Sequence, residues 1–273
     1  MNAILLAAGR GTRISRHIDG RPKCTVRLDE KATLIEYSID LLHRKGIEDI
    51  TIVLGYRGDL IREMLAGKGV KFAENPFYDV TNSIASLWFA RNELRGAGSF
   101  ILMNADVFLS EPALDIIMEE RRSPVLFYDV TRRAEADYKF YCEDGRVVKY
   151  GKDLSLAETS GEYVGCASFS HEFLPRFTAR LDQLIRQQKH SMWWEDVLYS
   201  MSAEQAILAK DIEGAFWGEV DFIEDFNRIM SFYRSRAAED LRRRPIHAEL
   251  DLIGRTTGTT APARDFGGMI AHP

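Results

Sequence analysis

The sequence contains few cysteines and no paired cysteine motif. Its three cysteines are Cys24, Cys142 and Cys166, and no two of them form a C-x-x-C pair. This spacing argues against a disulfide framework and against a cysteine-rich metal site. The histidines are also scattered, without the spacing of a metal site. We therefore expect reduced thiols in a cytoplasmic protein.

The sequence also lacks a long hydrophobic run and an excess of positive charge. The apolar stretch at residues 3–8 is too short for a membrane span or a signal-peptide core, and no basic segment precedes it. With 36 Lys and Arg against 41 Asp and Glu, the net charge is −5. We expect no membrane insertion and no nucleic-acid partner.

Apolar residues are numerous enough for one large domain. Of the 273 residues, 45% are hydrophobic and 28% are charged, which suits an α/β domain with a short appendage. We place the domain at residues 1–235, and the end of a long helix with a flexible arm at residues 236–273. From Gly254 onward, Gly, Thr, Pro and Ala dominate. Such an arm suits docking on a partner subunit, so a homodimer is a further expectation.

Apolar runs alternate with helical patterns in the first half of the chain. Strands are predicted at residues 2–6, 50–54, 71–73 and 100–103, and helices at residues 33–45, 57–66 and 83–93. This order predicts a mostly parallel sheet with helices on both faces. Such sheets bind ligands at the carboxyl ends of their strands.

The second half is predicted to contain more strands than helices. Strands are expected at residues 125–130, 138–143, 147–150, 164–169, 206–209 and 217–220, helices at residues 171–188 and 195–201, and a long helix from Phe222. Asp144-Gly145 is a hairpin turn between two of these strands. The chain has no internal repeat.

A glycine-rich turn follows the first predicted strand. It reads Leu6-Ala7-Ala8-Gly9-Arg10-Gly11-Thr12-Arg13, and Pro22-Lys23 follows it. Glycine lets the backbone approach a ligand closely, and exposed N–H groups beside basic side chains suit a polyphosphate. The turn matches neither the G-x-G-x-x-G nor the Walker pattern, and by itself it also fits a structural tight turn.

Two aspartates follow predicted strands that lie far apart in the sequence. Asp106 comes after the strand at residues 100–103, and Asp221 comes after the strand at residues 217–220. If these strands share an edge, the carboxylates meet, and such hard oxygen ligands suit Mg²⁺. Each aspartate also has a structural interpretation, because Asp221 with Glu224 fits a helix capping box and Asp106 fits a turn.

The glycine-rich turn, Pro22-Lys23 and the two aspartates, in this order, resemble the signature of the sugar-phosphate nucleotidyltransferase superfamily. The resemblance covers roughly the first 225 residues. It implies a Rossmann-like three-layer α/β fold with a mixed, mostly parallel central sheet. It also implies that the turn wraps a nucleoside triphosphate, that Lys23 contacts phosphate, and that Asp106 and Asp221 bind Mg²⁺.

The resemblance also implies that several basic residues take part in catalysis. They are Arg13 and Lys23 near the turn, and Lys152 after the predicted hairpin, with Lys139 as a further contact to the acceptor. Residues 145–152 resemble the family segment in which a lysine holds the acceptor's phosphate. A lysine between two anions offsets their repulsion and aligns an in-line attack, so no covalent nucleophile is expected. Lysines near a hairpin are also commonly solvated.

Within the superfamily, the chain looks most similar to small bacterial cytidylyltransferases that act on phosphocholine, 2-aminoethylphosphonate or inositol phosphate. The similarity rests on Gly55-Tyr56, residues 75–87, residues 160–165 and residues 193–196. It implies CTP as the donor, with Gly55, Tyr56, Asn82 and Ser83 near the nucleotide. Asn82 and Ser83 also fit the N-terminus of a helix.

An aromatic and acidic set is assigned to the acceptor by the same resemblance. Its members are Glu162, Tyr163, Trp193, Trp194, Glu195 and Asp196. Aromatic faces and carboxylates suit an ammonium group, which favours an amine-bearing phosphate or phosphonate over a neutral polyol phosphate. A phosphorylated amide or amino acid also fits. The alternatives are a core position for one tryptophan and helix capping by the acids.

The expected reaction is Mg²⁺-dependent transfer of CMP from CTP to a small phospho- or phosphono-acceptor. One alternative is a sugar-1-phosphate nucleotidyltransferase that uses UTP, GTP or dTTP. Another is a nucleotide-sensing module without catalysis, in which loss of Lys23, Asp106 or Asp221 would be expected. A glycosyltransferase would usually carry a D-x-D motif, and this chain has Asn104 at the first position.

Overall fold

The computed structural model describes residues 1–95 and 98–243. The chain divides into two compact units, Met1–Ser231 and Phe232–Pro273, and the strands of the described residues belong to the first. The predicted arm from Gly254 lies outside the described residues. Within the described part, no helix combines the length and the hydropathy needed to span a bilayer.

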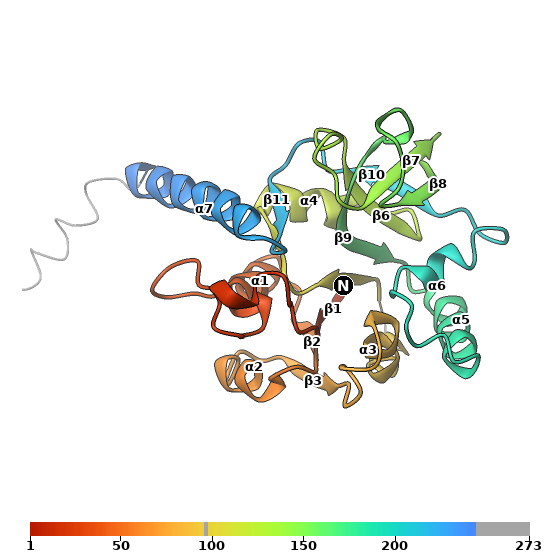
Figure 1. The fold of residues 1–273 in the computed structure, drawn as a ribbon, viewed down its shortest axis with the longest axis horizontal. Helices are drawn as coiled ribbons and strands as arrows, with labels where there is room; N and C mark the ends of the chain where they lie inside the picture. Colours follow the sequence, from red (N-terminus) through yellow and green to blue (C-terminus); the bar gives the residue numbers. More distant parts are fainter. Residues whose placement is uncertain (96–97, 244–273) are drawn as a thin grey trace, which may run out of the picture. The chain divides into compact units, whose positions relative to one another are not determined.

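Strands and helices alternate in the first half of the chain, as predicted (Figure 1). In chain order they are β1 (Asn2–Ala7), α1 (Leu34–Arg44), β2 (Asp49–Leu54), α2 (Gly58–Met64), β3 (Lys71–Glu74), α3 (Ser83–Phe89) and β4 (Phe100–Asn104). Short 3₁₀ helices lie between them at Ser15–His17 (η1), Lys23–Thr25 (η2) and Glu93–Arg95 (η3). Helix α3 ends before Glu93, the predicted last residue.

The second half contains the predicted strands and, apart from a short 3₁₀ helix, two elements that were not predicted. The elements are β5 (Val107–Leu109), α4 (Glu111–Glu119), β6 (Val125–Asp129), β7 (Lys139–Glu143), β8 (Arg146–Gly151), η4 (Leu156–Glu158), β9 (Gly161–Phe169), α5 (Leu174–Arg186), α6 (Asp196–Tyr199), β10 (Leu208–Asp211), β11 (Trp217–Glu219) and α7 (Ile223–Arg243). The unpredicted elements are β5 and α4. Helix α4 had a sequence signal, because Ser110 caps it and a proline occupies its first turn.

Nine strands form one mixed sheet in the order β3-β2-β1-β4-β9-β6-β10-β8-β7. Strands β3, β2, β1 and β4 pair in parallel, whereas β9 runs antiparallel to both β4 and β6. A separate two-stranded antiparallel sheet joins β5 to β11. The parallel half places the turn after β1 at the carboxyl edge of the sheet, where ligands bind in folds of this class.

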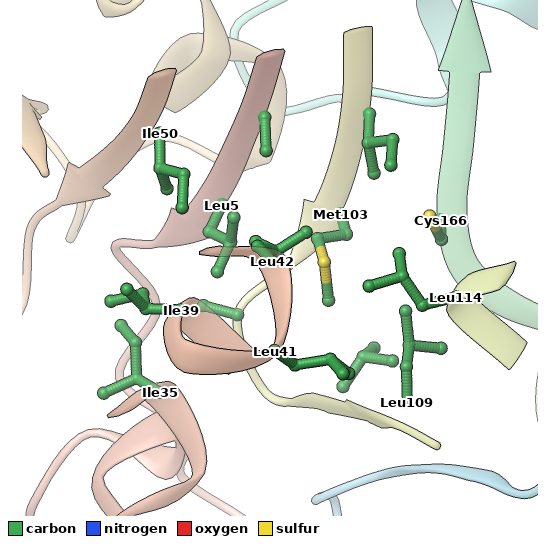
Figure 2. Close-up of a cluster of buried hydrophobic side chains, with 14 of the residues drawn as sticks. Leu5, Ile35, Ile39, Leu41, Leu42, Ile50, Met103, Leu109, Leu114 and Cys166 are labelled. Carbon is green, nitrogen blue, oxygen red and sulfur yellow. The ribbon is translucent and has the colours of Figure 1, made fainter. Parts of the chain in front are cut away.

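Helices cover both faces of the sheet, which confirms the three-layer fold. Side chains of β1 alternate, so that Leu5 packs with α1, α2 and α4, and Ile4 packs with α3, α5 and α6. Helix α1 begins with a capping box formed by Thr33 and Glu36. Figure 2 shows the α1 side chains, among them Leu42, beside Leu5 of β1 and Met103 of β4.

We predict that Phe177→Ala destabilises the protein without altering its fold. Phe177 of α5 is fully buried, and its ring stacks on Phe169 with centroids 4.8 Å apart. Removing such a ring leaves a cavity and costs about 3–5 kcal/mol. Urea unfolding measures the loss, and Gln183→Ala on the exposed face of the same helix is the matched control. Equal unfolding midpoints for the two variants would contradict this packing.

Candidate active site

A cavity of about 340 Å³ opens where the turn after β1 meets the β4–β5 and β11 termini. Most predicted site residues line this cavity: Leu6, Ala7, Ala8, Gly9, Gly11, Arg13, Lys23, Asn82, Ser83, Asp106, Lys152, Tyr163, Glu195 and Asp221. Seven others do not line it: Thr12, Gly55, Tyr56, Lys139, Glu162, Trp194 and Asp196. The predicted location at the carboxyl edge of the sheet therefore agrees with the cavity.

The glycine-rich turn lies directly against Lys23. Gly11 has a φ of +61°, and a Cβ atom there would collide with the Lys23 side chain. Pro22 immediately precedes η2, which begins at Lys23. A glycine is therefore needed at position 11 for both the backbone conformation and the passage of the lysine beneath the turn.

Pairing of β5 with β11 brings three carboxylates together. Glu219 pairs with Val107, and the Val220 N–H donates to the Asp106 carbonyl oxygen at 3.0 Å. Asp106, Glu219 and Asp221 can each offer one carboxylate oxygen within 4.8 Å of the others. The predicted meeting of Asp106 and Asp221 thus occurs through a small antiparallel sheet, not through two strands of the central sheet.

Glu219 was absent from the predicted site residues, although it lies only two residues before Asp221. The missed signal was the alternation of a strand, because residues two apart face the same side. Because Glu219 and Asp221 both face the same side, Asp106 has two carboxylate neighbours. Such a trio of hard oxygen donors could hold a divalent cation.

Two basic side chains reach this trio, Arg13 from the glycine-rich turn and Lys23 from the start of η2. Lys23 forms ion pairs with Asp221 and with Asp106, the latter at 3.4 Å. The Arg13 guanidinium lies 2.6 Å from the Asp221 carboxylate. The Phe222 N–H, which immediately precedes α7, donates to the Asp225 carboxylate at 2.9 Å, so the capping contact is made by Asp225. Asp221 therefore faces the turn, and its alternative interpretation as a helix cap is not supported.

The local electrostatics favour binding of a cation. Burial raises the pKa of Asp106, with Lys23 opposing the shift and Asp221 adding to it. Burial and the charges of Asp106 and Asp221 raise the pKa of Glu219 well above its usual value. Burial acts to lower the pKa of Lys23, but Asp106 and Asp221 outweigh it and raise this pKa. A further positive charge would relieve the repulsion among the acids.

Aromatic rings and charged groups line another part of the cavity. The Tyr138 ring centroid lies 5.4 Å from that of Trp193 and 5.9 Å from that of Tyr163. The Lys152 ammonium lies 2.5 Å from the Asp137 carboxylate and 6.0 Å from the Trp193 ring centroid. Asp137 and Tyr138 were not predicted, because nothing in the sequence ties their loop to residues 193–196.

Glu195 lines the same part of the cavity beside Tyr163. It is 6% exposed, and burial raises its pKa to about 8, while the Tyr163 hydroxyl acts in the opposite direction. The carboxyl group is therefore largely neutral at pH 7 in the unliganded protein.

Of the two adjacent tryptophans, Trp193 lines the cavity and Trp194 belongs to the core. Trp194 is fully buried, and its indole N–H donates to the Asn104 side-chain oxygen at 3.2 Å. Asp196 accepts a hydrogen bond from the Trp193 N–H at 2.9 Å. Trp194 is therefore the core tryptophan, and Asp196 is the capping acid, that the alternative interpretations described.

Two predicted acceptor residues instead support the segments that line the cavity. The Lys139 ammonium donates to the carbonyl oxygens of Lys152 and Leu154 at 3.1 and 2.9 Å. Glu162 accepts from the Asp137 N–H at 2.7 Å and from Arg132. Lys139 and Glu162 therefore hold the backbone near Lys152 and Asp137.

The predicted nucleotide residues outside β1 have structural contacts of their own. Asn82 accepts from the Ser83 N–H at 2.8 Å as the cap of α3, and Ser83 accepts from the Trp194 N–H at 2.9 Å. Both also line the cavity, so the capping interpretation and the cavity position coexist. Gly55 and Tyr56 contact the glycine-rich turn from outside, and Thr12 is exposed on it.

Known proteins resemble this chain over most of its length. It is 26% identical over 248 residues to CTP:phosphoglutamine cytidylyltransferase of Campylobacter jejuni, covering 82% of this chain and 97% of the relative. It is 26% identical over 237 residues to choline-phosphate cytidylyltransferase of Streptococcus pneumoniae, covering 84% and 96%. The structure of the inositol-1-phosphate CTP transferase from T. maritima matches with a TM-score of 0.71 at 21% identity, covering 85% and 96%.

These similarities confirm the predicted relationship and the predicted fold. The structural match, at its low identity, supports the fold alone. The model of the MobA-like NTP transferase domain matches residues 3–207, which is well over half of the chain. The protein therefore belongs to the MobA-like NTP transferase family, and it is a nucleotidyltransferase.

Proposed function

We propose that this protein is a Mg²⁺-dependent cytidylyltransferase that transfers CMP from CTP to a small phosphate or phosphonate bearing an ammonium group. The observation that carries the proposal is one cavity lined by three carboxylates, a glycine-rich turn and an aromatic, acidic wall. CTP as the donor is supported by the names of both curated relatives. The ammonium group is inferred from the rings of Tyr138, Tyr163 and Trp193.

The three carboxylates suit the metal that this reaction requires. Asp106, Glu219 and Asp221 would hold Mg²⁺, because they are hard oxygen donors that already repel one another. When bound, the ion would neutralise the negative charge on the α-phosphate and on the departing pyrophosphate.

The chain's own residues would bind and orient the two anions. Backbone N–H groups of the turn, with Arg13 and Lys23, bind the triphosphate, and Lys152 binds the acceptor's phosphate. An acceptor oxygen attacks the α-phosphorus, the bond from that phosphorus to the bridging oxygen breaks, and pyrophosphate leaves with the electron pair. The attacking oxygen is already anionic, so no general base is needed.

The proposal is tested by measuring pyrophosphate release from CTP with a panel of acceptors. The panel contains phosphocholine, 2-aminoethylphosphonate, phosphoglutamine and inositol phosphate, and each is repeated with UTP, GTP and dTTP. We expect turnover with CTP and an ammonium-bearing acceptor. A sugar 1-phosphate, glucose 1-phosphate, is tested alongside with the same nucleotides. Folded protein that turns over none of the panel, or that prefers another nucleotide with the sugar 1-phosphate, would contradict the proposal.

Neutralising one member of the trio should remove metal-dependent turnover. We expect Asp106→Asn and Asp221→Asn each to lower kcat/KM by at least about a hundredfold, because charge stabilisation in the transition state is lost. The rise in melting temperature on adding Mg²⁺ should disappear as well. Asp59→Asn, an exposed aspartate on α2, is the control. Wild-type rates in both variants would refute the metal assignment.

The raised pKa of Glu195 predicts that acceptor binding depends on pH. Glu195 is mostly neutral below about pH 8, and an ammonium group favours its ionised form. Binding should therefore release a proton at pH 7, and the acceptor's affinity should rise by up to about tenfold per pH unit as pH approaches 8.

Calorimetric titration of the acceptor between pH 6 and 9, in buffers of differing ionisation enthalpy, measures both effects. Glu195→Gln is the matched control, since it keeps the acceptor's own titration and removes that of the protein. Identical pH profiles for the wild type and the variant would show that Glu195 does not face the bound cation.

A further inference from the structure

We propose that Tyr56 is a positioning residue that clamps the two ends of residues 8–20, a segment that contains the glycine-rich turn, and thereby holds the turn ready for the triphosphate. Tyr56 lies outside the cavity, so it acts through the turn. The inference rests on the proposed function for the identity of the ligand. The clamp itself rests on contacts within the protein.

The first contact fixes the start of the turn. The Tyr56 N–H donates to the Ala8 carbonyl oxygen at 3.0 Å. The approach is possible because residue 55 is glycine. A Cβ atom on Gly55 would lie 2.7 Å from the Ala8 oxygen and 2.7 Å from the Tyr78 Cβ. The end of β2 thus binds the backbone immediately before Gly9.

The second contact fixes Gly20, at the far end of this segment. The Tyr56 hydroxyl donates to the Gly20 carbonyl oxygen at 2.9 Å, and the Arg57 guanidinium donates to the same oxygen at 3.4 Å. Gly20 has a φ of +62°, a left-handed conformation that suits glycine. Pro22-Lys23 follows two residues later. This contact therefore lies close in the chain to Lys23, which forms ion pairs with the carboxylate trio.

A third contact lies between these two anchors. The Arg10 guanidinium lies 5.4 Å from the centroid of the Tyr56 ring. Tyr56 therefore contacts residues 8–20 at Ala8, Arg10 and Gly20. The cavity-lining Gly9, Gly11 and Arg13 lie between the two outer contacts. A segment rich in glycine loses much conformational freedom on binding a ligand, and a preformed turn avoids part of that loss.

Removal of the hydroxyl alone tests the clamp. Tyr56→Phe keeps the N–H bond to Ala8 and the ring beside Arg10. One net hydrogen bond corresponds to about a fivefold change in equilibrium. We expect the Kd and KM for CTP to rise by about fivefold, while kcat at saturating CTP stays within about twofold. Tyr37→Phe is the matched control, since the Tyr37 hydroxyl donates to the Leu109 carbonyl oxygen at 3.0 Å outside the turn.

Limited trypsin digestion gives a readout that does not depend on the nucleotide. Arg13 at the end of the turn and Arg16 in η1 are both exposed within residues 8–20, and cleavage after them requires local opening. Mass spectrometry of the fragments should show cleavage about fivefold faster in Tyr56→Phe than in the wild type or in Tyr37→Phe.

Faster cleavage together with weaker CTP binding in Tyr56→Phe supports the proposal. Unchanged cleavage overturns the clamp, and faster cleavage with unchanged CTP affinity overturns its role in preparing the turn. A wild-type protein that binds no CTP contradicts the proposed function instead, and the digestion still decides whether Tyr56 clamps the turn.

Discussion

Repulsion among three carboxylates is the constraint around which this site is arranged. The β5–β11 pairing holds oxygens of Asp106, Glu219 and Asp221 within 4.8 Å of one another. Without compensation, such an arrangement would cost stability, because burial weakens the screening of like charges. Arg13 of the glycine-rich turn and Lys23 at the start of η2 provide that compensation. The same residues are thereby held where a triphosphate and a divalent cation would meet.

The two halves of the sheet contribute different parts of the cavity. The parallel half supplies the turn after β1 and its anchors on β2, because parallel strands end at one edge. The antiparallel half supplies Lys152, Tyr163 and the loop that carries Asp137 and Tyr138. One part suits a nucleotide, and the other suits a small acceptor. Their meeting in one cavity is what a transfer between two bound anions needs.

Local patterns in the sequence predicted the alternation of strands and helices, the turn and both aspartates. Strand pairing between distant segments could not be seen in the sequence. The pairing of β5 with β11, which brings the three carboxylates together, was therefore not predicted. The same limit explains Asp137 and Tyr138, whose proximity to Trp193 depends on tertiary packing. The side chains of adjacent residues also point in different directions. For this reason Trp194 lies in the core, whereas Trp193 lines the cavity. Gly55 and Tyr56 were predicted to lie near the nucleotide, but they do not line the cavity, and Tyr56 contacts the backbone of the glycine-rich turn instead.

The central claim is that the carboxylate trio binds the metal that serves the nucleotide. A crystal grown with Mn²⁺ and an unreactive CTP analogue tests it most directly, because manganese is located by its anomalous scattering. The account predicts one manganese ion bound by Asp106, Glu219 and Asp221, with the analogue's phosphates against the glycine-rich turn. Nucleotide bound in the cavity with manganese held by other residues would contradict the account.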